Sequence, residues 1–288
     1  MKNAMLKLFV SISAFALCAI TLLSLSVGYR SVLADTSKTV YCDDGLYRGT
    51  GTVTSATYDI VCNDYEVIDG KALSMPPSFG NTDHSMKNTC GPLAGLNISA
   101  FFDRWCTELI PDYTPGVMFP SGYEYYMDKR LTQTKQALRN LYDLMETEKY
   151  GGATAETFKS GLKAYANNAG YSVSTSSFYS NRVSVNLSRL KTAIIEDKIG
   201  VILCERFDYV PRIFIMENSA RIVKEHHDAP HIMMVTGYTT YNFYNDGITV
   251  ATETFLHVSS GFSSGETGFV QLNDSFLAID EAIIYSIY

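Results

Sequence analysis

NTCGPLAGLNISAFFDRW, residues 88–105, is the stretch around which the rest of the sequence is organised. Apolar side chains recur in it at intervals of three and four residues, which predicts an amphipathic helix with one side in a core. Pro92 suits only a first helical turn, because its nitrogen has no hydrogen to donate, so we expect the helix to begin near Cys90. The predicted core side comprises Leu93, Leu96, Ala100, Phe101 and Trp105.

A cysteine at the start of a helix is a candidate nucleophile. The positive end of the helix dipole and the unpaired backbone N–H groups of the first turn stabilise a thiolate. The structural alternative for Cys90 is a buried core thiol, the ordinary environment of a cysteine. A histidine far along the chain, described below, favours the nucleophile.

The composition is that of a globular protein with a targeting segment. The 288 residues are 46% apolar and 18% charged, which allows a sizeable core. Residues 1–34 are predicted to be a signal peptide, because Lys2 and Lys7 precede an apolar run over residues 8–25 and a cleavage site ends at Ala34. The competing interpretation is an uncleaved membrane anchor, since the run is long enough to span a bilayer. Both interpretations predict a secreted or cell-surface protein.

Charge and cysteine content restrict the partners of the mature chain. Without residues 1–34 it carries 20 basic and 30 acidic residues, a formal charge of −10, so nucleic acid and membrane are not expected partners. Five cysteines remain, which leaves at least one thiol unpaired. Cys42 and Cys62 are the expected disulfide in an oxidising compartment, whereas Cys106 and Cys204 form either a second disulfide or two buried thiols. The sequence does not indicate an oligomeric state.

The order of elements predicts an α+β fold, with helices first and an antiparallel sheet afterwards. Residues 35–74 alternate β-forming residues with glycine breaks and are predicted to form an N-terminal β-hairpin extension, before a main domain over residues 75–288. Further helices are predicted over about 127–148, over 158–166 and after a cap at Asn186. Strands are predicted at Val201–Cys204, Ile213–Met216, His231–Tyr238, Tyr241–Tyr244, Thr254–Val258, Gly268–Leu272 and Ala282–Tyr285.

His231 opens one of these strands and is the candidate base. An imidazole that faces a thiol at a helix start takes the thiol proton and keeps the thiolate available near neutral pH. His231 follows Cys90 by 141 residues, the long separation of papain-type enzymes. The structural alternative is a core histidine with satisfied hydrogen bonds.

The sequence resembles the papain-like cysteine peptidases, in particular the bacterial streptopain-like and bacteriocin-processing-like groups, over residues 75–288. The resemblance implies a helical half that carries the nucleophile helix, packed against an antiparallel sheet half. It implies that Cys90 is the nucleophile, that His231 is the base and then the acid, that a peptide or protein is the substrate, and that no metal or cofactor is required. The matching segments are Cys90-Gly-Pro92, Leu190–Leu203, His231–Tyr238, Phe255–Phe262 and Gly268–Leu272.

The sequence departs from the family pattern at two positions. The family's oxyanion-stabilising glutamine lies six residues before the cysteine, where this chain has His84, so His84 or the nearby Asn88 or Asn81 is expected to donate to the oxyanion. The family's asparagine that orients the histidine is replaced by Ser259, a neutral and shorter partner. A serine in this place orients the imidazole less firmly.

Three other interpretations stay open. Residues 225–228, Glu-His-His-Asp, together with His231 suggest zinc, but they lack helical ligand spacing, and a solvated polar loop beside the active site is the simpler interpretation. A cell-wall peptide amidase or transpeptidase would use the same thiol and imidazole. A catalytically lapsed binding module would keep the fold without turnover.

Overall fold

The computed structural model describes residues 37–38, 53–73, 76–80, 86–113, 118–119, 122–123, 132–180, 184–262 and 267–288. The chain divides into two compact units, Met1–Asp35 and Thr36–Tyr288, and all described residues belong to the second. The expected signal peptide, Cys42 and His84 lie outside the described residues.

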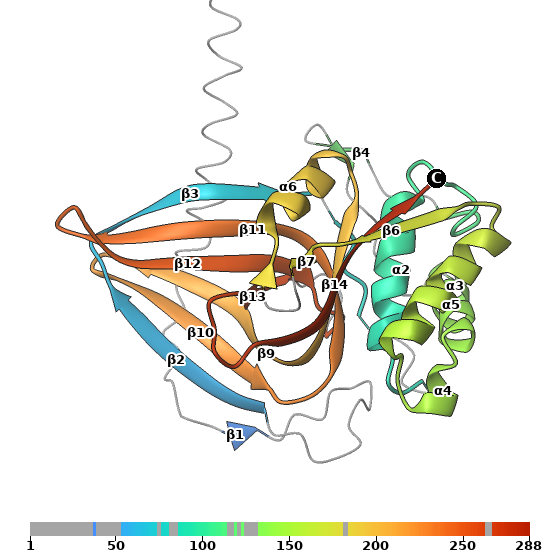
Figure 1. Cartoon of the computed structure of the whole chain (residues 1–288), viewed down its shortest axis with the longest axis horizontal. Helices are drawn as coiled ribbons and strands as arrows, with labels where there is room; N and C mark the ends of the chain where they lie inside the picture. The colour runs from blue at the N-terminus through green and yellow to red at the C-terminus, as the bar shows by residue number, and fades with distance from the viewer. Residues whose placement is uncertain are drawn as a thin grey trace, which may run out of the picture. The chain divides into compact units, whose positions relative to one another are not determined.

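A large antiparallel sheet dominates the described structure, so the predicted papain-like division into a helical half and a sheet half is wrong (Figure 1). Its ten strands run in the order β1-β2-β10-β9-β13-β12-β11-β3, and β14 and β6 extend it from β9. Two short pairs lie apart from it, β4 (Met118–Phe119) with β5 (Gly122–Tyr123) and β7 (Tyr179–Ser180) with β8 (Ser184–Val185). The ten strands are β1 Ser37–Lys38, β2 Val53–Val61, β3 Asp64–Ala72, β6 Val173–Ser177, β9 Ile199–Met216, β10 Ser219–His227, β11 His231–Asn245, β12 Ile248–Ser259, β13 Gly268–Gln271 and β14 Ala278–Ile287.

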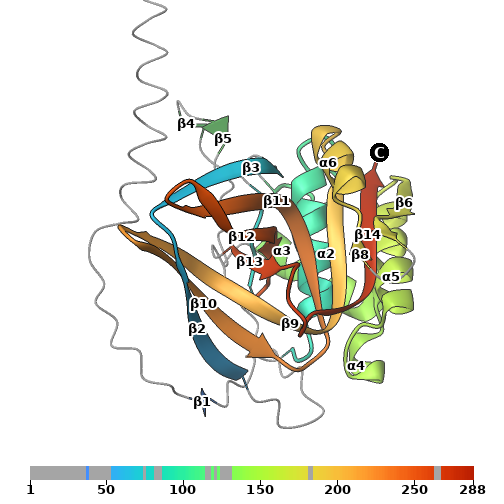
Figure 2. The same ribbon diagram turned by 60° about the vertical axis from the view of Figure 1, so that its left-hand side comes forward.

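Strand β9 makes this one continuous sheet. Its first half pairs with β11 and β14, and its second half pairs with β10 and β13. Because β13 also pairs with β12 and β12 with β11, the pairings β9–β13–β12–β11–β9 close into a ring. The sheet therefore curls, and the arms β3–β11–β12 and β2–β10–β9 face each other (Figure 2).

Strands β2 and β3 do not form the predicted hairpin. β2 pairs with β10 and β3 pairs with β11, so the two strands extend different edges of the sheet. Between them, Cys62 N donates to Asn218 O at 3.3 Å and Asn63 N donates to Tyr244 O at 2.9 Å, which ties the tips of both arms together. Residues 53–72 are thus integral to the sheet. Cys62 is a buried thiol, as are Cys106 and Cys204, which are not joined to each other.

Five helices are described, and α2, α3, α4 and α5 gather on the side of β14 and β6 away from the curled arms (Figure 1). Helix α2 begins at Cys90, as predicted, but all 13 of its residues are buried, so it is not amphipathic. One side of α2 packs against α3 and α5, and the other side packs against β11. Trp105 lies beyond the helix end and is 55% exposed, contrary to the prediction. The helices are α2 Cys90–Phe102, α3 Thr132–Leu144, α4 Thr147–Tyr150, α5 Ala155–Asn168 and α6 Leu187–Ile195.

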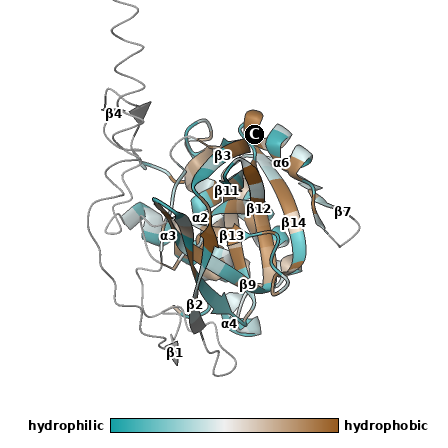
Figure 3. Cartoon of the chain, turned by 90° about the vertical axis from the view of Figure 1, so that its left-hand side faces the viewer, coloured by the Kyte–Doolittle hydropathy of each residue, from teal (hydrophilic) through white to brown (hydrophobic). Residues whose placement is uncertain are grey.

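The main core lies between these helices and the strands β9, β11 and β14. Hydrophobic stretches along β12 and β14 are visible in Figure 3. Two smaller apolar clusters lie between the arms of the curled sheet and are centred on Phe243 and Phe255. Among the described residues, no helix has the length and apolar character needed to cross a membrane.

Candidate active site

Cys90 is the first residue of α2 and is only 3% exposed. It carries a thiol rather than a disulfide. The preceding residue, Thr89, occupies the N-cap position, but its side chain makes no capping hydrogen bond. No acidic side chain lies in the first turn either. Neither the Thr89 side chain nor an acid in the first turn therefore neutralises the partial positive charge of the helix start, which favours a negative charge on the sulfur.

His231 begins β11, is 4% exposed, and has its tautomer fixed by the backbone. Its Nε2 atom lies 2.7 Å from Ser260 O. Because a carbonyl oxygen only accepts hydrogen bonds, Nε2 carries the hydrogen, and the neutral ring keeps its basic lone pair on Nδ1. Burial lowers the pKa of His231 to about 4, against the opposing effect of the Ser260 hydrogen bond and with a smaller contribution from His227. At neutral pH the ring is thus an uncharged base.

The elements that carry Cys90 and His231 are in direct contact. A Cβ placed on Gly91 would lie 3.4 Å from Ile232 Cδ1, so the residues that follow the two candidates touch. A Cβ placed on Gly261 would lie 3.5 Å from Leu93 Cδ1, so the turn that holds His231 also rests on the first turns of α2. The starts of α2 and β11 are therefore neighbours, and Ile232, the residue after His231, is the one whose side chain faces Gly91.

Two phenylalanine rings fix the plane of the His231 imidazole. Phe262 lies with its ring centroid 4.7 Å from that of His231 at an interplanar angle of 22°, and Phe207 lies at 5.6 Å and 26°. His227 stacks on the same two rings, at 4.9 Å and 4° from Phe207 and at 4.9 Å and 14° from Phe262. The rings of Phe207, His227, His231 and Phe262 form an aromatic cluster, in which the two imidazoles are each stacked on both phenyl rings.

The hydrogen-bond acceptor of the His231 ring is the backbone carbonyl of the residue after Ser259, not the Ser259 hydroxyl. Ser259 Oγ donates to Pro77 O at 2.7 Å and is buried, so its hydroxyl holds the segment before α2. The Nε2 atom of His231 does not bond to this hydroxyl. It donates to the backbone oxygen Ser260 O instead. Every residue has a backbone carbonyl, so the sequence cannot indicate which one accepts a hydrogen bond. The prediction therefore named the adjacent side chain, Ser259.

Of the two predicted oxyanion donors, Asn88 is within the described residues and His84 is not. Asn88 lies two residues before Cys90 in the left-handed backbone region, with φ 60°, a conformation that asparagine tolerates better than most residues. Its Oδ1 atom is buried and has no hydrogen-bond partner among the described residues. The unpaired atom is an acceptor and is suited to accept from a substrate N–H, whereas donation to an oxyanion falls to Nδ2 of the same amide.

The residues considered as a zinc site do not form a metal-ligand set among the described residues. Glu225, His226 and His227 belong to strand β10 rather than to a polar loop, and neighbours on a strand point to opposite faces. His226 Nδ1 is paired with Asp208, whereas His227 stacks in the aromatic cluster. Within the described part of the chain, no group of three or more histidine, cysteine or acidic residues is placed to hold a metal.

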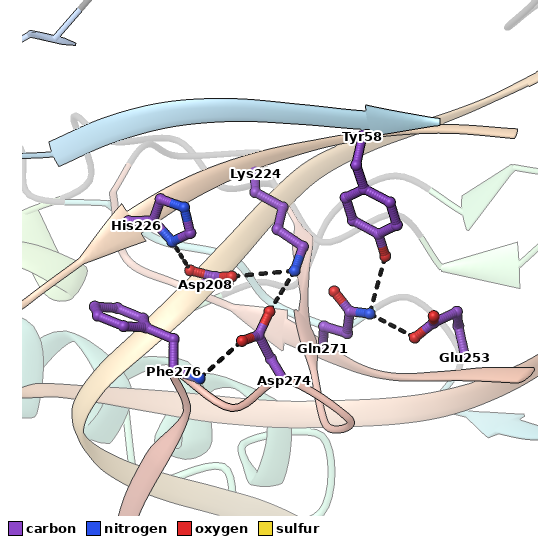
Figure 4. A network of polar contacts seen from close by, with 8 residues as sticks. All are labelled: Tyr58, Asp208, Lys224, His226, Glu253, Gln271, Asp274 and Phe276. Carbon is purple, nitrogen blue, oxygen red and sulfur yellow. Dashed lines mark hydrogen bonds and ion pairs between the residues drawn. The ribbon is translucent and has the colours of Figure 1, made fainter. Parts of the chain in front are cut away.

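Sequence reasoning missed a buried polar network on the other face of these strands (Figure 4). Lys224 bridges the carboxylates of Asp208, at 3.1 Å, and Asp274, and Asp208 also holds His226. Beside them, Gln271 donates to Tyr58 and to Glu253. Burial raises the pKa of Asp208. The alternation along β10, with Lys224 and His226 on one face, is the only signal for this network in the sequence.

Comparison with family models finds no family that matches this chain, and comparisons with curated proteins and with solved structures find no similar protein. The chemistry proposed below therefore depends on the geometry and on the residues themselves.

Proposed function

We propose that the chain is a cysteine-dependent hydrolase that cleaves peptide bonds, with Cys90 as nucleophile and His231 as general base. The observation that carries the proposal is the 2.7 Å hydrogen bond from His231 Nε2 to Ser260 O. It leaves the basic Nδ1 on a neutral imidazole, at the start of a strand that packs against the helix headed by Cys90.

The chemistry follows in two balanced steps. His231 Nδ1 takes the proton of the Cys90 thiol while the sulfur attacks the substrate carbonyl, and the same proton then passes to the leaving amine as the C–N bond breaks. Water next gives a proton to Nδ1 and attacks the thioester carbonyl. The C–S bond breaks, the thiol recovers the proton, and a carboxylic acid leaves. The backbone N–H of Cys90 and the amide of Asn88 are the proposed donors to the oxyanion. No step requires a metal or a cofactor.

A peptide or protein is the proposed substrate, because the resemblance to papain-like peptidases implies attack on the carbonyl carbon of a peptide amide. The protein is proposed to act outside the cytoplasm, because of the signal sequence expected in residues 1–34.

One observation favours a second candidate, a binding module without turnover. Cys90 is 3% exposed and His231 is 4% exposed, so a substrate must displace side chains to reach the sulfur. A lapsed enzyme would retain exactly such a closed site as part of its core.

Alkylation of the thiol by iodoacetamide, located by peptide mass spectrometry, separates the two candidates. The enzyme requires labelling of Cys90 that falls at least tenfold in His231→Ala at neutral pH. His257→Ala is the matched control, since His257 is half-buried, is bonded to Thr239 Oγ1 at 2.7 Å and has its pKa lowered to about 4 by desolvation. It is expected to leave labelling unchanged. Equal labelling of wild type and His231→Ala contradicts the enzyme and supports the binding module.

A further inference from the structure

We infer that the side-chain amide of Asn88 holds one amino-acid residue of the substrate at two points. Asn88 Oδ1 accepts from the N–H of the residue whose carbonyl is attacked, while Nδ2 of the same amide meets the oxygen of that carbonyl. The substrate class is then an α-aminoacyl group whose nitrogen carries a hydrogen, which excludes proline and simple acyl chains at this position. This inference rests on the proposed function, because it describes how the same site recognises its substrate.

The start of α2 leaves two buried acceptors vacant beside the proposed nucleophile. Asparagine and threonine commonly cap helices from an extended conformation. Asn88 instead has φ 60°, and Thr89 has φ −85° and ψ 2° and makes no capping hydrogen bond. Asn88 Oδ1 and Thr89 Oγ1 are buried and have no hydrogen-bond partner among the described residues. A buried acceptor without a donor costs free energy, so these oxygens are suited to a donor that arrives with a ligand.

The same helix shows how an asparagine amide holds one residue of a peptide chain. Asn97 is buried on α2, and its Oδ1 accepts from Phe79 N at 2.6 Å while its Nδ2 donates to Phe79 O at 3.3 Å. An amide has an acceptor and a donor side by side, so it pairs with the N–H and the C=O of a single residue. Asn88 carries the same group with its acceptor unused. The contact of Asn97 with Phe79 is therefore a model of the contact proposed between Asn88 and the substrate.

Asn88 also lies where the chain passes from the surface to the sulfur. Lys87 is exposed and Asn88 is half-buried, whereas Thr89 and Cys90 are buried. A peptide that enters from the side of Lys87 thus meets the Asn88 amide before it meets Cys90.

The experiment compares three reagents that alkylate Cys90 in the full chain, with rates measured by peptide mass spectrometry. Acetyl-alanyl chloromethyl ketone offers both the N–H and the carbonyl, and the Cys90 sulfur displaces chloride from its methylene carbon. Its N-methyl analogue differs only in that the alanyl nitrogen has no hydrogen. Iodoacetamide has no aminoacyl group and measures the reactivity of the thiol itself. In wild type we expect the N-methyl analogue to react about tenfold more slowly than its parent, the effect of one lost hydrogen bond to a buried acceptor.

Three variants assign this rate ratio to Asn88. Asn88→Gly removes the amide and suits the left-handed backbone, so the two chloromethyl ketones are expected to react at the same rate. Asn88→Asp keeps an oxygen acceptor but loses Nδ2, so the ratio is expected to persist although both reagents react more slowly. Asp197→Gly is the matched control, because it makes a similar substitution at φ 52° in the exposed turn after α6, and it is expected to keep the wild-type ratio. Thermal unfolding shows whether each variant is folded.

Equal rates for the two chloromethyl ketones in wild type overturn the inference, whether or not the variants fold. A tenfold ratio that survives in Asn88→Gly overturns it as well, because the N–H then bonds elsewhere, and so does a ratio that is lost in Asn88→Asp. Failure of the proposed function looks different, since His231→Ala would then react with iodoacetamide as fast as wild type.

Discussion

At the residue scale, a backbone atom rather than the predicted side chain makes the hydrogen bond to His231. Ser260 O holds His231, whereas Ser259 Oγ holds Pro77 O. Cys90 and His231 could be proposed from the sequence because their chemistry belongs to their side chains and because Pro92 marks the start of the helix. The hydrogen-bond acceptor of His231 was not accessible, since every residue offers the same carbonyl group.

Ser259→Ala tests this reassignment. The substitution leaves Pro77 O without its donor, so we expect a loss of about 1 kcal/mol in the free energy of unfolding. Cleavage of a peptide substrate is expected to stay within about threefold of wild type, because the Ser260 carbonyl is unchanged. Urea denaturation and steady-state kinetics measure the two effects. A hundredfold loss of kcat with unaltered stability would return the orienting role to the Ser259 hydroxyl.

Asp103, just after α2, gives a residue-scale prediction about pH. Burial raises its pKa to about 7, although Asp103 Oδ1 accepts a hydrogen bond from Ile110 N at 2.9 Å. A carboxyl whose pKa is higher in the folded state binds its proton more tightly there, so it stabilises at low pH and this stability is lost between about pH 4 and pH 7.

Asp103→Asn keeps an oxygen for Ile110 N and removes the titration. We expect the variant to be more stable than wild type at pH 8, by on the order of 2 kcal/mol, and to lose this advantage at pH 4. Urea denaturation at the two pH values measures it. A stability difference between Asp103→Asn and wild type that is the same at pH 4 and pH 8 would show that Asp103 does not titrate in this range.

At the element scale, local signals predicted helices well and strand connections poorly. Asn186 caps α6 through a 3.0 Å bond from Arg189 N, as expected from its side chain. Strand β9 was predicted as two pieces, because the charged residues Glu205, Arg206 and Asp208 interrupt its apolar pattern. Asp208 in that interval is 1% exposed, and its partners Lys224 and His226 on the neighbouring strand β10 make the burial possible. An ion pair between two strands cannot be predicted from the few residues around either partner.

Helix α5 offers a test of close packing. A Cβ on Gly161 would lie 2.5 Å from Met145 Cγ and 3.0 Å from Leu144 O, so α5 approaches the end of α3 as closely as a glycine allows. We expect Gly161→Ala to cost about 1–3 kcal/mol in the free energy of unfolding, despite the better helix propensity of alanine. Ser160→Ala, an exposed neighbour, is the control and is expected to change stability by less than about 0.5 kcal/mol. Thermal denaturation of both variants measures this, and a more stable Gly161→Ala would contradict the packing.

The buried network around Lys224 is expected to contribute more to the free energy of unfolding. Lys224→Met keeps much of the side-chain volume but leaves Asp208 and Asp274 without their shared cation, so we expect a loss of about 3–5 kcal/mol at pH 7. Adding Asp274→Asn to that variant is expected to restore part of the loss, because one of the two uncompensated charges is then absent. Chemical denaturation measures both, and a second substitution that worsens the first would rule out charge as the cause.

At the scale of the whole molecule, the curl of the sheet determines what each segment does. Residues 35–74 were predicted to form a separate hairpin, but residues 53–72 add one strand to each arm and join the arm tips through residues 62 and 63. The sequence contained the strand pattern but not the pairing, because both partners, β10 and β11, lie more than 150 residues later in the chain.

Truncation tests this integration. A chain that starts at residue 74 would expose the edges of β10 and β11, so we expect it to aggregate or remain unfolded. A chain that starts at residue 35 is the control and is expected to fold. Circular dichroism and size-exclusion chromatography compare the two. A soluble, active protein from residue 74 onward would instead identify residues 35–73 as a removable segment.

The measurement that bears most directly on the central proposal is the mass of the Cys90 peptide after a peptide substrate is mixed with the protein and quenched in acid. A thioester formed through a Cys90–His231 pair adds the mass of the acyl fragment to that peptide in wild type and adds nothing in His231→Ala. Cleavage of the substrate with no acyl fragment on Cys90, or the same adduct in both proteins, would contradict the proposal.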